Sequence, residues 1–335
     1  MPQLEASRIV LASRPKGKPT AENFRTETIL LPAPGPGEIL VKALYLSVDP
    51  YMRGRMSEAK SYVPPYEIGG VVGGGAVAEV VESGDDSFQP GDVVSGQFGW
   101  QTHALVPAKH LRKIDPSLAP MTASLGLLGV TGLTAYFGLI DICSPQPNET
   151  VVVSGAAGAV GMTVGQIAKI LGCRVVGIAG SDEKVQYLTD KLGFDEAINY
   201  KTTDNLTKAL KHVCPQGIDI YFDNVGGEIS DAVFRSLNTG ARISVCGQIA
   251  LYNLEQPDVG PRLLTQVLIH RALVKGFIIS DYAARFPEGV KQLAKWYHDG
   301  QLKFEETIAE GFDQTVDAFL DLFSGANLGK QIVRV

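Results

Sequence analysis

The sequence predicts an α/β protein in which a doubly wound parallel sheet accompanies a second, β-rich domain. Three observations support this fold class. A chain of 335 residues is longer than one compact core normally needs. Residues 1–125 contain short β-branched runs separated by glycine and proline, whereas the residues that follow alternate strand-like runs with longer segments of helical period.

The β-rich character of residues 1–125 comes from three runs at 38–46, 71–81 and 92–95. Turn residues separate these runs at short intervals, which is typical of a compact all-β unit. At the other end of the chain we expect a strand at 307–311, a helix at 315–323 and a strand at 330–335. These elements exceed what the parallel sheet needs, so we expect residues 305–335 to complete the β-rich domain.

Residues 126–304 show the alternation expected for parallel strands that helices connect. The expected strands are 150–154, 174–179, 197–200, 219–223, 241–246 and 273–279. The expected helices are 161–171, 182–192, 204–213, 228–237, 260–270 and 287–298. Six strands with helical crossovers match a Rossmann dinucleotide-binding sheet, because parallel neighbours require crossover connections.

Composition and charge exclude several classes of function. The net charge is −6 and there is no basic run with interleaved aromatic residues, so nucleic acid is not an expected partner. No apolar run reaches the about 20 residues of a membrane-spanning helix, so we expect no membrane partner either. Residues 1–14 lack the layout of a signal peptide, and we expect a cytoplasmic protein.

The cysteines and histidines show no spacing typical of a metal site. The four cysteines form no C-x-x-C pair, and none of the five histidines lies three or four residues from another. We therefore expect no metal ion, and we expect these residues to fill the core or the surface.

Residues 151–161 carry the clearest local signal for a ligand. Three valines and Ser154 lead into a loop of small residues in which Gly155, Gly158 and Gly161 are spaced three apart. Small residues let backbone amides approach a pyrophosphate, and the start of the following helix adds favourable partial charge. The spacing departs from G-x-G-x-x-G, and a tight turn without a ligand is the alternative. The βαβ context favours dinucleotide binding.

Residues 179–184 bear on which dinucleotide is bound. An NAD enzyme usually has a carboxylate at the end of the second strand, about 20 residues past the loop. Here no carboxylate ends the strand, while Ser181 offers a hydrogen bond and Lys184 a positive charge that suit a 2′-phosphate. We expect NADPH. Asp182 leaves NAD open, and the alternative for Ser181 and Lys184 is a helix cap and a solvated lysine.

Segments spread over nearly the whole chain resemble the zinc-independent medium-chain dehydrogenase/reductase superfamily. The resemblance is closest to the group of leukotriene B4 12-hydroxydehydrogenase/15-oxoprostaglandin 13-reductase, plant 2-alkenal double-bond reductases and bacterial curcumin reductase. The segments that carry it are 46–56 with Asp-Pro-Tyr-Met-Arg, 132–139, 158–161, 222–227 with Asp-Asn-Val-Gly-Gly, and 327–330. Zinc-dependent relatives have Gly-His-Glu where this chain has residues 67–70 without histidine, which again favours a metal-free site.

This resemblance implies a GroES-like β domain, a Rossmann domain and NADPH bound between them. It assigns the pyrophosphate to Gly158, Ala159, Val160 and Gly161. It assigns the adenosine 2′-phosphate to Lys184 and Tyr200, beside Ser181. It assigns the rest of the cofactor to Asn224, Cys246 and the following residues up to Tyr252, Phe277, Ile278, Ile279 and Asn327. Independently, Asn224 and Cys246 lie at the carboxyl ends of expected strands, where ligands bind in open α/β sheets.

The implied reaction is reduction of the carbon–carbon double bond of an α,β-unsaturated carbonyl compound. Such a reaction needs a donor for the enolate oxygen and a proton for the α-carbon, and a neutral phenol suits the donor role. Tyr51 is the expected donor and Tyr252 the expected proton relay; packing at the domain interface and an ordinary loop position are the alternatives. Tyr62 and Tyr66 are expected to line the substrate wall, or else to pack in a Pro-rich turn.

Two other functions are compatible with the sequence. Quinone reduction by NADPH would use a similar metal-free site. A non-catalytic NADPH-binding protein would keep the glycine loop and Lys184 without needing the tyrosines. Relatives of this group are often dimers, so a homodimer is a further possibility.

Overall fold

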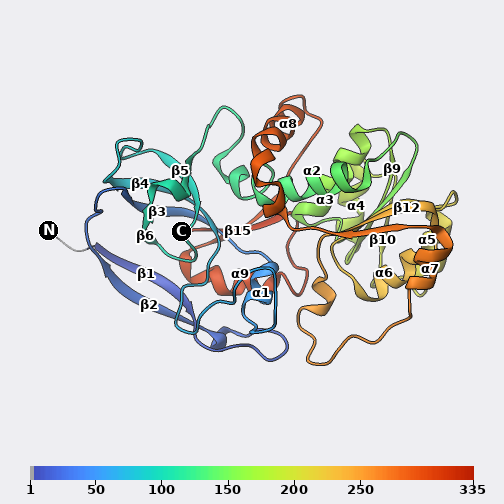
Figure 1. Cartoon of the computed structure of the whole chain (residues 1–335), viewed down its shortest axis with the longest axis horizontal. Coiled ribbons are helices and arrows are strands. Elements are labelled where there is room, and N and C mark those ends of the chain that lie inside the picture. Colours follow the sequence, from blue (N-terminus) through green and yellow to red (C-terminus); the bar gives the residue numbers. More distant parts are fainter. Residues whose placement is uncertain (1–3) are drawn as a thin grey trace. The chain divides into compact units, whose positions relative to one another are not determined.

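The computed structural model describes residues 4–335, which form two compact units (Figure 1). The β-rich unit comprises residues 4–125, Glu306–Asn327 and Gln331–Val335. The parallel-sheet unit comprises Gly126–Glu305 and Leu328–Lys330. Within the described residues, no helix has both the length and the apolar character that crossing a membrane requires.

The β-rich unit contains a seven-stranded sheet and a separate two-stranded sheet. The large sheet has the order β14-β15-β3-β4-β5-β7, with β6 also paired to β3, and the small sheet joins β1 to β2. The strands are β1 (Leu4–Leu11), β2 (Phe24–Leu31), β3 (Glu38–Ser47), β4 (Gly75–Ser83), β5 (Val93–Gln97), β6 (His103–Pro107), β7 (Leu111–Lys113), β14 (Glu306–Glu310) and β15 (Lys330–Arg334). The helices are α1 (Tyr51–Arg55) and α9 (Thr315–Asp321).

The C-terminal tail contributes to the core of the β-rich unit. Strand β15 pairs antiparallel with β3, with Ile332 opposite Ser47. Phe319 of α9 packs edge-on against the buried ring of Trp100, with 5.6 Å between ring centroids, and Phe24 of β2 completes this aromatic cluster. Elements more than 200 residues apart in sequence therefore share one core.

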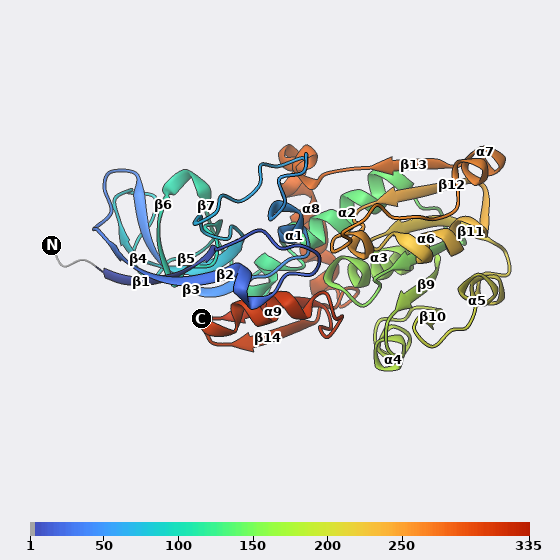
Figure 2. The same ribbon diagram turned by 90° about the horizontal axis from the view of Figure 1, so that it is seen from below.

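The parallel-sheet unit is built on six strands in the order β10-β9-β8-β11-β12-β13. Numbered from the first strand of the unit this order is 3-2-1-4-5-6, which is that of a Rossmann fold. The strands are β8 (Thr150–Ser154), β9 (Arg174–Ala179), β10 (Glu196–Asn199), β11 (Ile218–Asp223), β12 (Leu237–Val245) and β13 (Leu273–Gly276). All the pairings are parallel, and β10 and β13 form opposite edges of the sheet (Figure 2).

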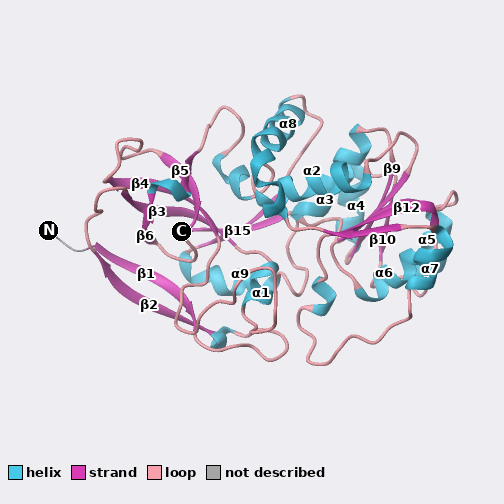
Figure 3. Ribbon diagram, viewed as in Figure 1, coloured by secondary structure: helices cyan, strands magenta, loops and turns pink. Residues whose placement is uncertain are grey.

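Helices cover both faces of this sheet (Figure 3). One hydrophobic cluster packs α2 (Val130–Cys143), α3 (Ala159–Ile170), α4 (Asp182–Asp190) and α8 (Phe286–His298) on one face. The other packs α5 (Leu206–Val213), α6 (Gly227–Phe234) and α7 (Leu264–His270) on the opposite face. Successive strand residues alternate between the two: Val151 and Val153 belong to the first cluster and Val152 to the second. The predicted fold class is confirmed.

Some elements differ from the expectations. The helix expected at 260–270 begins only at Leu264, after Gly260 and Pro261, and the strand expected at 273–279 ends at Gly276, ahead of a 3-10 helix at Ile279–Arg285. Helix α2 was not predicted as a helix. It is buried on most sides, so its sequence lacks the one-sided apolar period by which a surface helix is recognised.

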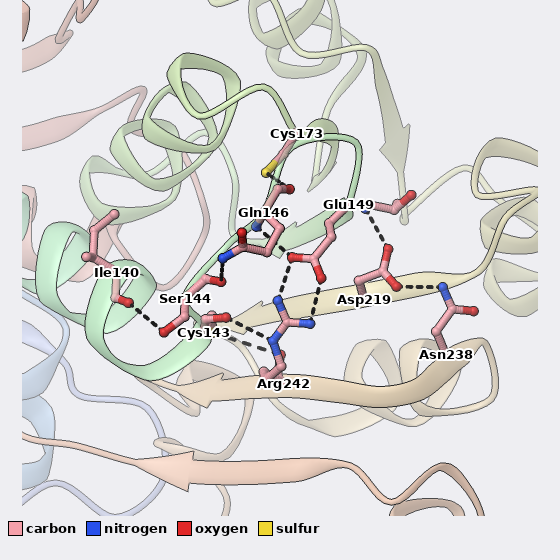
Figure 4. Close-up of polar contacts among 10 residues, drawn as sticks. Ile140, Cys143, Ser144, Gln146, Glu149, Cys173, Asp219, Asn238 and Arg242 are labelled. Atoms are coloured by element: carbon pink, nitrogen blue, oxygen red, sulfur yellow. Dashed lines mark hydrogen bonds and ion pairs between the residues drawn. The ribbon is translucent and has the colours of Figure 1, made fainter.

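A polar network ties the end of α2 to the amino-terminal side of the sheet (Figure 4). Arg242 of β12 donates two hydrogen bonds to the carboxylate of Glu149, at 2.9 and 2.5 Å, and a third to the carbonyl of Cys143 at 2.9 Å. The two charged side chains are only 21% and 22% exposed. Partial burial alone would raise the pKa of Glu149, but the hydrogen bonds from Arg242 and from the amide of Gln146 lower it.

Replacing Glu149 by Gln should lower the free energy of unfolding by about 1.5–3 kcal/mol at pH 7, because a charge-assisted hydrogen-bonded pair is lost. The pKa of Glu149 is depressed in the folded protein, so its contribution is present above the unfolded value and is lost as pH falls through the folded value. The stabilities of wild type and variant from denaturant unfolding should therefore begin to converge near the unfolded pKa of about 4.3 and meet at the lower pH where folded Glu149 is protonated.

The control is Glu310→Gln, which removes an exposed partner of Arg334 and should change stability much less than Glu149→Gln does. A difference between wild type and Glu149→Gln that stays constant from pH 7 to acid would contradict the prediction.

Candidate active site

The glycine loop joins β8 to α3 at the carboxyl end of the sheet. Gly155 has φ +57°, and a Cβ on Gly161 would lie 2.3 Å from the carbonyl oxygen of Gly155, so both positions require glycine. Gly158 is the N-cap of α3 and no side chain caps this helix end. The predicted residues Gly158, Ala159, Val160 and Gly161 thus form the start of a twelve-residue helix whose end suits a phosphate group.

The segment Leu328–Lys330 lies against this loop. The amide of Gly329 donates to the carbonyl of Ala157 at 2.9 Å, and Gly329 forms a parallel bridge with Gly158. A Cβ on Gly329, which has φ +69°, would lie 2.0 Å from the carbonyl oxygen of Glu305. The segment is therefore held on both sides by backbone, which fixes the loop on which the pyrophosphate is expected to bind.

The end of β9 offers hydrogen-bonding and positive groups. Ser181 is the N-cap of α4 and its hydroxyl accepts from the amide of Lys184 at 3.3 Å, so the capping role considered above is present. The carboxylate of Asp182 accepts a hydrogen bond from Asn199 at 2.7 Å. Lys184 is only partly exposed, and burial together with the charge of Lys201 lowers its pKa. The ammonium groups of Lys184 and Lys201 are close enough to affect each other, and both suit a 2′-phosphate.

Lys201 was not among the predicted residues. It follows Tyr200 directly after β10, and its Cε and the ring of Tyr200 both lie 3.2 Å from where a Cβ of Gly180 would stand. Tyr200 itself is 40% exposed, which leaves its ring available. Because the carboxyl ends of parallel strands meet at one edge, a lysine just after the third strand was a signal in the sequence that the prediction did not use.

Asn224 and Cys246 lie directly after β11 and β12, as expected. The side-chain amide of Asn224 donates to the carbonyl of Ser154 at 2.8 Å, and its backbone amide donates to the Ser154 hydroxyl at 2.9 Å. Burial, followed by the charge of Asp223, raises the pKa of the Cys246 thiol to about 12. This thiol is therefore neutral and is neither a nucleophile nor an acid near pH 7.

Tyr252 lies at the end of the turn that follows β12. It is the C-cap of the 3-10 helix Ile249–Leu251, and the amide of Gln248 donates to its hydroxyl at 3.5 Å. A Cβ on Gly247 would lie 3.4 Å from the same hydroxyl oxygen. The hydroxyl of Tyr252 therefore lies next to the backbone of Gly247 and Gln248, on the carboxyl side of the sheet where Asn224 also lies.

The remaining residues that are predicted to bind the cofactor lie after β13 and in the β-rich unit. The ring of Phe277 packs in the core against Phe222 and Tyr282, so only its backbone and that of Ile278 and Ile279 are suited to hydrogen bonding with a ligand. Asn327 lines a cavity of about 180 Å³ in the β-rich unit, together with Thr307, Asp317 and Gln331.

The other predicted tyrosines belong to the β-rich unit. Tyr51 begins α1, and burial followed by the charge of Asp49 raises its pKa well above the ordinary phenol value. Tyr66 is 5% exposed, its hydroxyl donates to the carbonyl of Gly73 at 2.6 Å and the guanidinium of Arg55 covers its ring at 4.2 Å. These contacts favour the packing alternative for Tyr66. Tyr62 is 58% exposed and is the better candidate for a substrate wall.

The structure thus brings most of the predicted cofactor residues together at one edge of the parallel sheet. Tyr51, Tyr62, Tyr66 and Asn327 belong to the other unit, and their approach to the cofactor stays a prediction. Across residues 4–335, no group of three or more His, Cys, Asp or Glu side chains is arranged to hold a metal ion.

Two family models match the chain. One, described as the N-terminal domain of oxidoreductase, matches residues 7–114, and the other, described as zinc-binding dehydrogenase, matches residues 159–296. The chain is 59% identical over 329 residues to the putative NADP-dependent oxidoreductase YfmJ of Bacillus subtilis, covering 98% of this chain and 97% of that protein.

Enzymes with named substrates are similar over nearly the same length. The chain is 46% identical to NADPH-dependent curcumin reductase of Escherichia coli (98% and 96% covered) and 43% identical to NADP(+)-dependent 2-alkenal reductase of Nicotiana tabacum (99% and 98% covered). The crystal structure of CurA from Vibrio vulnificus in complex with NADPH matches with a TM-score of 0.93 at 44% identity, covering 98% of this chain and 99% of that one.

The two lysines at the end of the sheet should select NADPH over NADH. We expect Lys184→Ala and Lys201→Ala each to weaken NADPH binding by about tenfold while changing NADH binding less than about twofold, because only NADPH carries the 2′-phosphate. Titration of each variant with both cofactors, followed by fluorescence, measures the effect.

Lys208→Ala, in the exposed face of α5, is the matched control and should leave both affinities unchanged. Equal losses for NADPH and NADH in a lysine variant would show that this lysine does not contact the 2′-phosphate.

Proposed function

Because the chain belongs to the medium-chain dehydrogenase/reductase superfamily, in the group of the 2-alkenal, prostaglandin and curcumin reductases, we propose that it reduces the carbon–carbon double bond of α,β-unsaturated aldehydes and ketones with NADPH. The observation that carries this proposal is the similarity, over almost the whole chain, to enzymes that reduce 2-alkenals and curcumin. These compounds share a double bond conjugated to a carbonyl group.

The residues at the carboxyl edge of the parallel sheet fit the cofactor. The uncapped start of α3 suits the pyrophosphate, and Lys184 with Lys201 suits the 2′-phosphate. Asn224 is held against Ser154, and the backbone of 277–279 is available for the carboxamide end. When bound, NADPH supplies a hydride for the β-carbon of the substrate.

Tyr51 is proposed to stabilise the charge that develops on the substrate oxygen. Its raised pKa keeps the phenol protonated across the neutral range, so it stays a hydrogen-bond donor. A donor aimed at an oxyanion in a site without water lowers the activation barrier by about 3–4 kcal/mol. Tyr252 is proposed to deliver or relay the proton that the α-carbon takes up.

The substrate class is tested by mixing the purified protein with NADPH and either 2-alkenals or quinones, and following the absorbance of the cofactor. Oxidation of NADPH by 2-alkenals but not by quinones supports the proposal. Oxidation by quinones alone would favour the quinone reductase alternative. Absence of oxidation with every acceptor, while NADPH still binds, would favour the non-catalytic alternative.

Replacing Tyr51 by Phe should lower kcat with a 2-alkenal by about a hundredfold and leave the Kd for NADPH unchanged, because only the donor to the substrate oxygen is lost. Tyr45→Phe is the matched control, since its hydroxyl serves an exposed bond to Arg334. An unchanged kcat in Tyr51→Phe would remove Tyr51 from the reaction.

The protein is also proposed to form a homodimer through β13 and α7. All four residues of β13 are exposed, although this strand ends the sheet and carries Leu273 and Val274. Leu264 and Leu268 of α7 are 81% and 76% exposed. An exposed apolar edge strand invites pairing with a further strand, and two copies of β13 can pair antiparallel across a two-fold axis.

The exposed apolar area is of the size that a dimer needs. Seven large apolar side chains are exposed between residues 254 and 274: Leu254, Val259, Leu264, Leu268, Ile269, Leu273 and Val274. At about 100 Å² for each side chain they supply about 700 Å² per copy, close to the about 800 Å² per partner of a stable interface.

Light scattering after size exclusion should give a mass twice that of the 35.8 kDa chain for wild type. Leu268→Glu should shift the protein to the monomer, because a charge is then buried in each copy of the interface. Leu30→Glu, at an exposed position of β2, is the control. A monomeric wild type, or a Leu268→Glu protein that stays dimeric, would contradict this assembly.

A cytoplasmic location is proposed because the cysteines form no disulfide bonds. Cys143, Cys173, Cys214 and Cys246 are all free thiols, and three of them are buried. Unpaired thiols of this kind suit a reducing compartment.

A further inference from the structure

One buried carboxylate, Asp223 at the end of β11, lies beneath the candidate cofactor site. Asp223 is only 3% exposed, and its carboxylate accepts six hydrogen bonds. The oxygen Oδ1 accepts from the hydroxyls of Ser154 and Tyr221 at 3.1 and 2.8 Å, and from the amides of Val225 and Gly226 at 3.0 and 2.9 Å. The oxygen Oδ2 accepts from Ser230 and from Nε2 of Gln248, both at 2.8 Å.

None of these six donors is a cation. A buried carboxylate without an ion-pair partner is retained only where its hydrogen bonds replace its hydration. Three of the donors come from β8, α6 and the turn after β12, so one charge holds segments that are far apart in sequence. This arrangement exceeds what the packing of β11 alone requires.

We propose that Asp223 is a positioning residue for the reduction: its carboxylate holds Asn224 and the turn that carries Tyr252 in the arrangement that receives the nicotinamide end of NADPH. The inference rests on the proposed function, since it assigns a role to a residue beneath that same site.

Asp223 acts on Asn224 through Ser154. The Ser154 hydroxyl donates to Asp223 and accepts from the amide of Asn224 at 2.9 Å, while the side chain of Asn224 donates to the Ser154 carbonyl at 2.8 Å. Asn224 is therefore fixed by a hydroxyl whose own orientation the carboxylate sets.

Asp223 acts on the turn through Gln248. Nε2 of Gln248 bonds both Asp223 and the carbonyl of Gly247, and the backbone amide of Gln248 donates to the hydroxyl of Tyr252. The carbonyl of Asp223 also accepts from the amides of Cys246 and Gly247 at 2.9 and 3.0 Å. Side chain and backbone of one residue thus hold the whole start of this turn.

The two oxygens of Asp223 allow a sharp experiment. Gln248→Glu places a second carboxyl group against Oδ2. At low pH the new group is protonated and donates to Asp223 as Gln248 does, whereas at high pH two carboxylates repel each other and the turn is displaced. We expect the Kd for NADPH of Gln248→Glu to be within about threefold of wild type at pH 6 and about tenfold weaker at pH 9.

The wild-type Kd is measured at both pH values, and the effect is the ratio of the variant's Kd to the wild-type Kd at each pH, because Lys184 and the 2′-phosphate also titrate in the wild type. The titratable side chains next to Asp223 and Gln248 are Tyr221 on the same strand, and Cys246 and Tyr252 in the segment that follows β12. Burial first, and then the charge of Asp223, raises the pKa of Tyr221 well above its ordinary range, and the same two causes raise that of Cys246 to about 12. Gln256→Glu, at an exposed position of the following segment, adds the same charge away from Asp223 and is the control.

The decisive variant is a reversed pair, in which the carboxylate of Asp223 and the amide of Gln248 exchange positions. In Asp223→Asn combined with Gln248→Glu, the asparagine keeps an oxygen for the amides of Val225 and Gly226 and offers its NH₂ group to the new carboxylate. We expect this double variant to regain NADPH affinity at pH 9 to within about threefold of wild type and to regain kcat with a 2-alkenal. A residue that only stabilises the fold would change the thermal midpoint without this pH-dependent loss and rescue.

The outcomes separate this inference from the proposed function. If wild type binds NADPH and reduces 2-alkenals but Gln248→Glu behaves like Gln256→Glu, or if the reversed pair is no better than Gln248→Glu at pH 9, the role of Asp223 is overturned alone. If wild type binds no NADPH, the proposed function itself is overturned. Should Gln248→Glu fail to fold, Gln248→Ala takes its place: about tenfold weaker NADPH binding supports the role, and unchanged binding overturns it.

Discussion

The carboxyl edge of the parallel sheet depends on one buried negative charge. Asp223 gathers donors from three segments, and without it the amides of Val225 and Gly226 and the hydroxyls of Ser154, Tyr221 and Ser230 would lose a shared acceptor. Buried donors without a partner each carry a penalty of about 1–3 kcal/mol. The shape of this edge, with Asn224 and the 247–252 turn upon it, follows from satisfying those donors around one carboxylate.

The amino and carboxyl ends of the parallel strands carry different charged and hydrogen-bonding groups. At the amino-terminal side, Arg242 and Glu149 neutralise each other, and Asp219 accepts hydrogen bonds from the backbone amide of Thr150 and the side-chain amide of Asn238. At the carboxyl side, α3 begins without a side-chain cap and Lys184 lies beside Lys201. The backbone amides at the start of α3 and the two lysine side chains suit a negatively charged ligand on that side.

The sequence predicted the fold class and the strands of the parallel sheet well, because buried parallel strands are short apolar runs between turn residues. The strand at 150–154 was predicted with its observed bounds, and the helix predicted from Gly161 begins two residues earlier, at Ala159. Lys201 and the hydrogen bond between Gln248 and Asp223 were not predicted, because each depends on neighbours that are distant in sequence. Helix α7 shows the same limit: Leu264 and Leu268 read as an ordinary apolar stripe, and only the fold reveals them as exposed.

By itself the sequence determined the alternating strands of the parallel sheet, the glycine loop that leads into a helix and the absence of a carboxylate at the end of β9, since these follow from local residue type and spacing. The tertiary structure alone decided that Tyr66 contacts Gly73 and Arg55 and that Lys184 lies near Lys201. It also decided that Asp223 accepts hydrogen bonds from three segments. The physical reason is that burial and hydrogen-bond pairing are properties of neighbours in space, which the sheet brings together from separate crossovers.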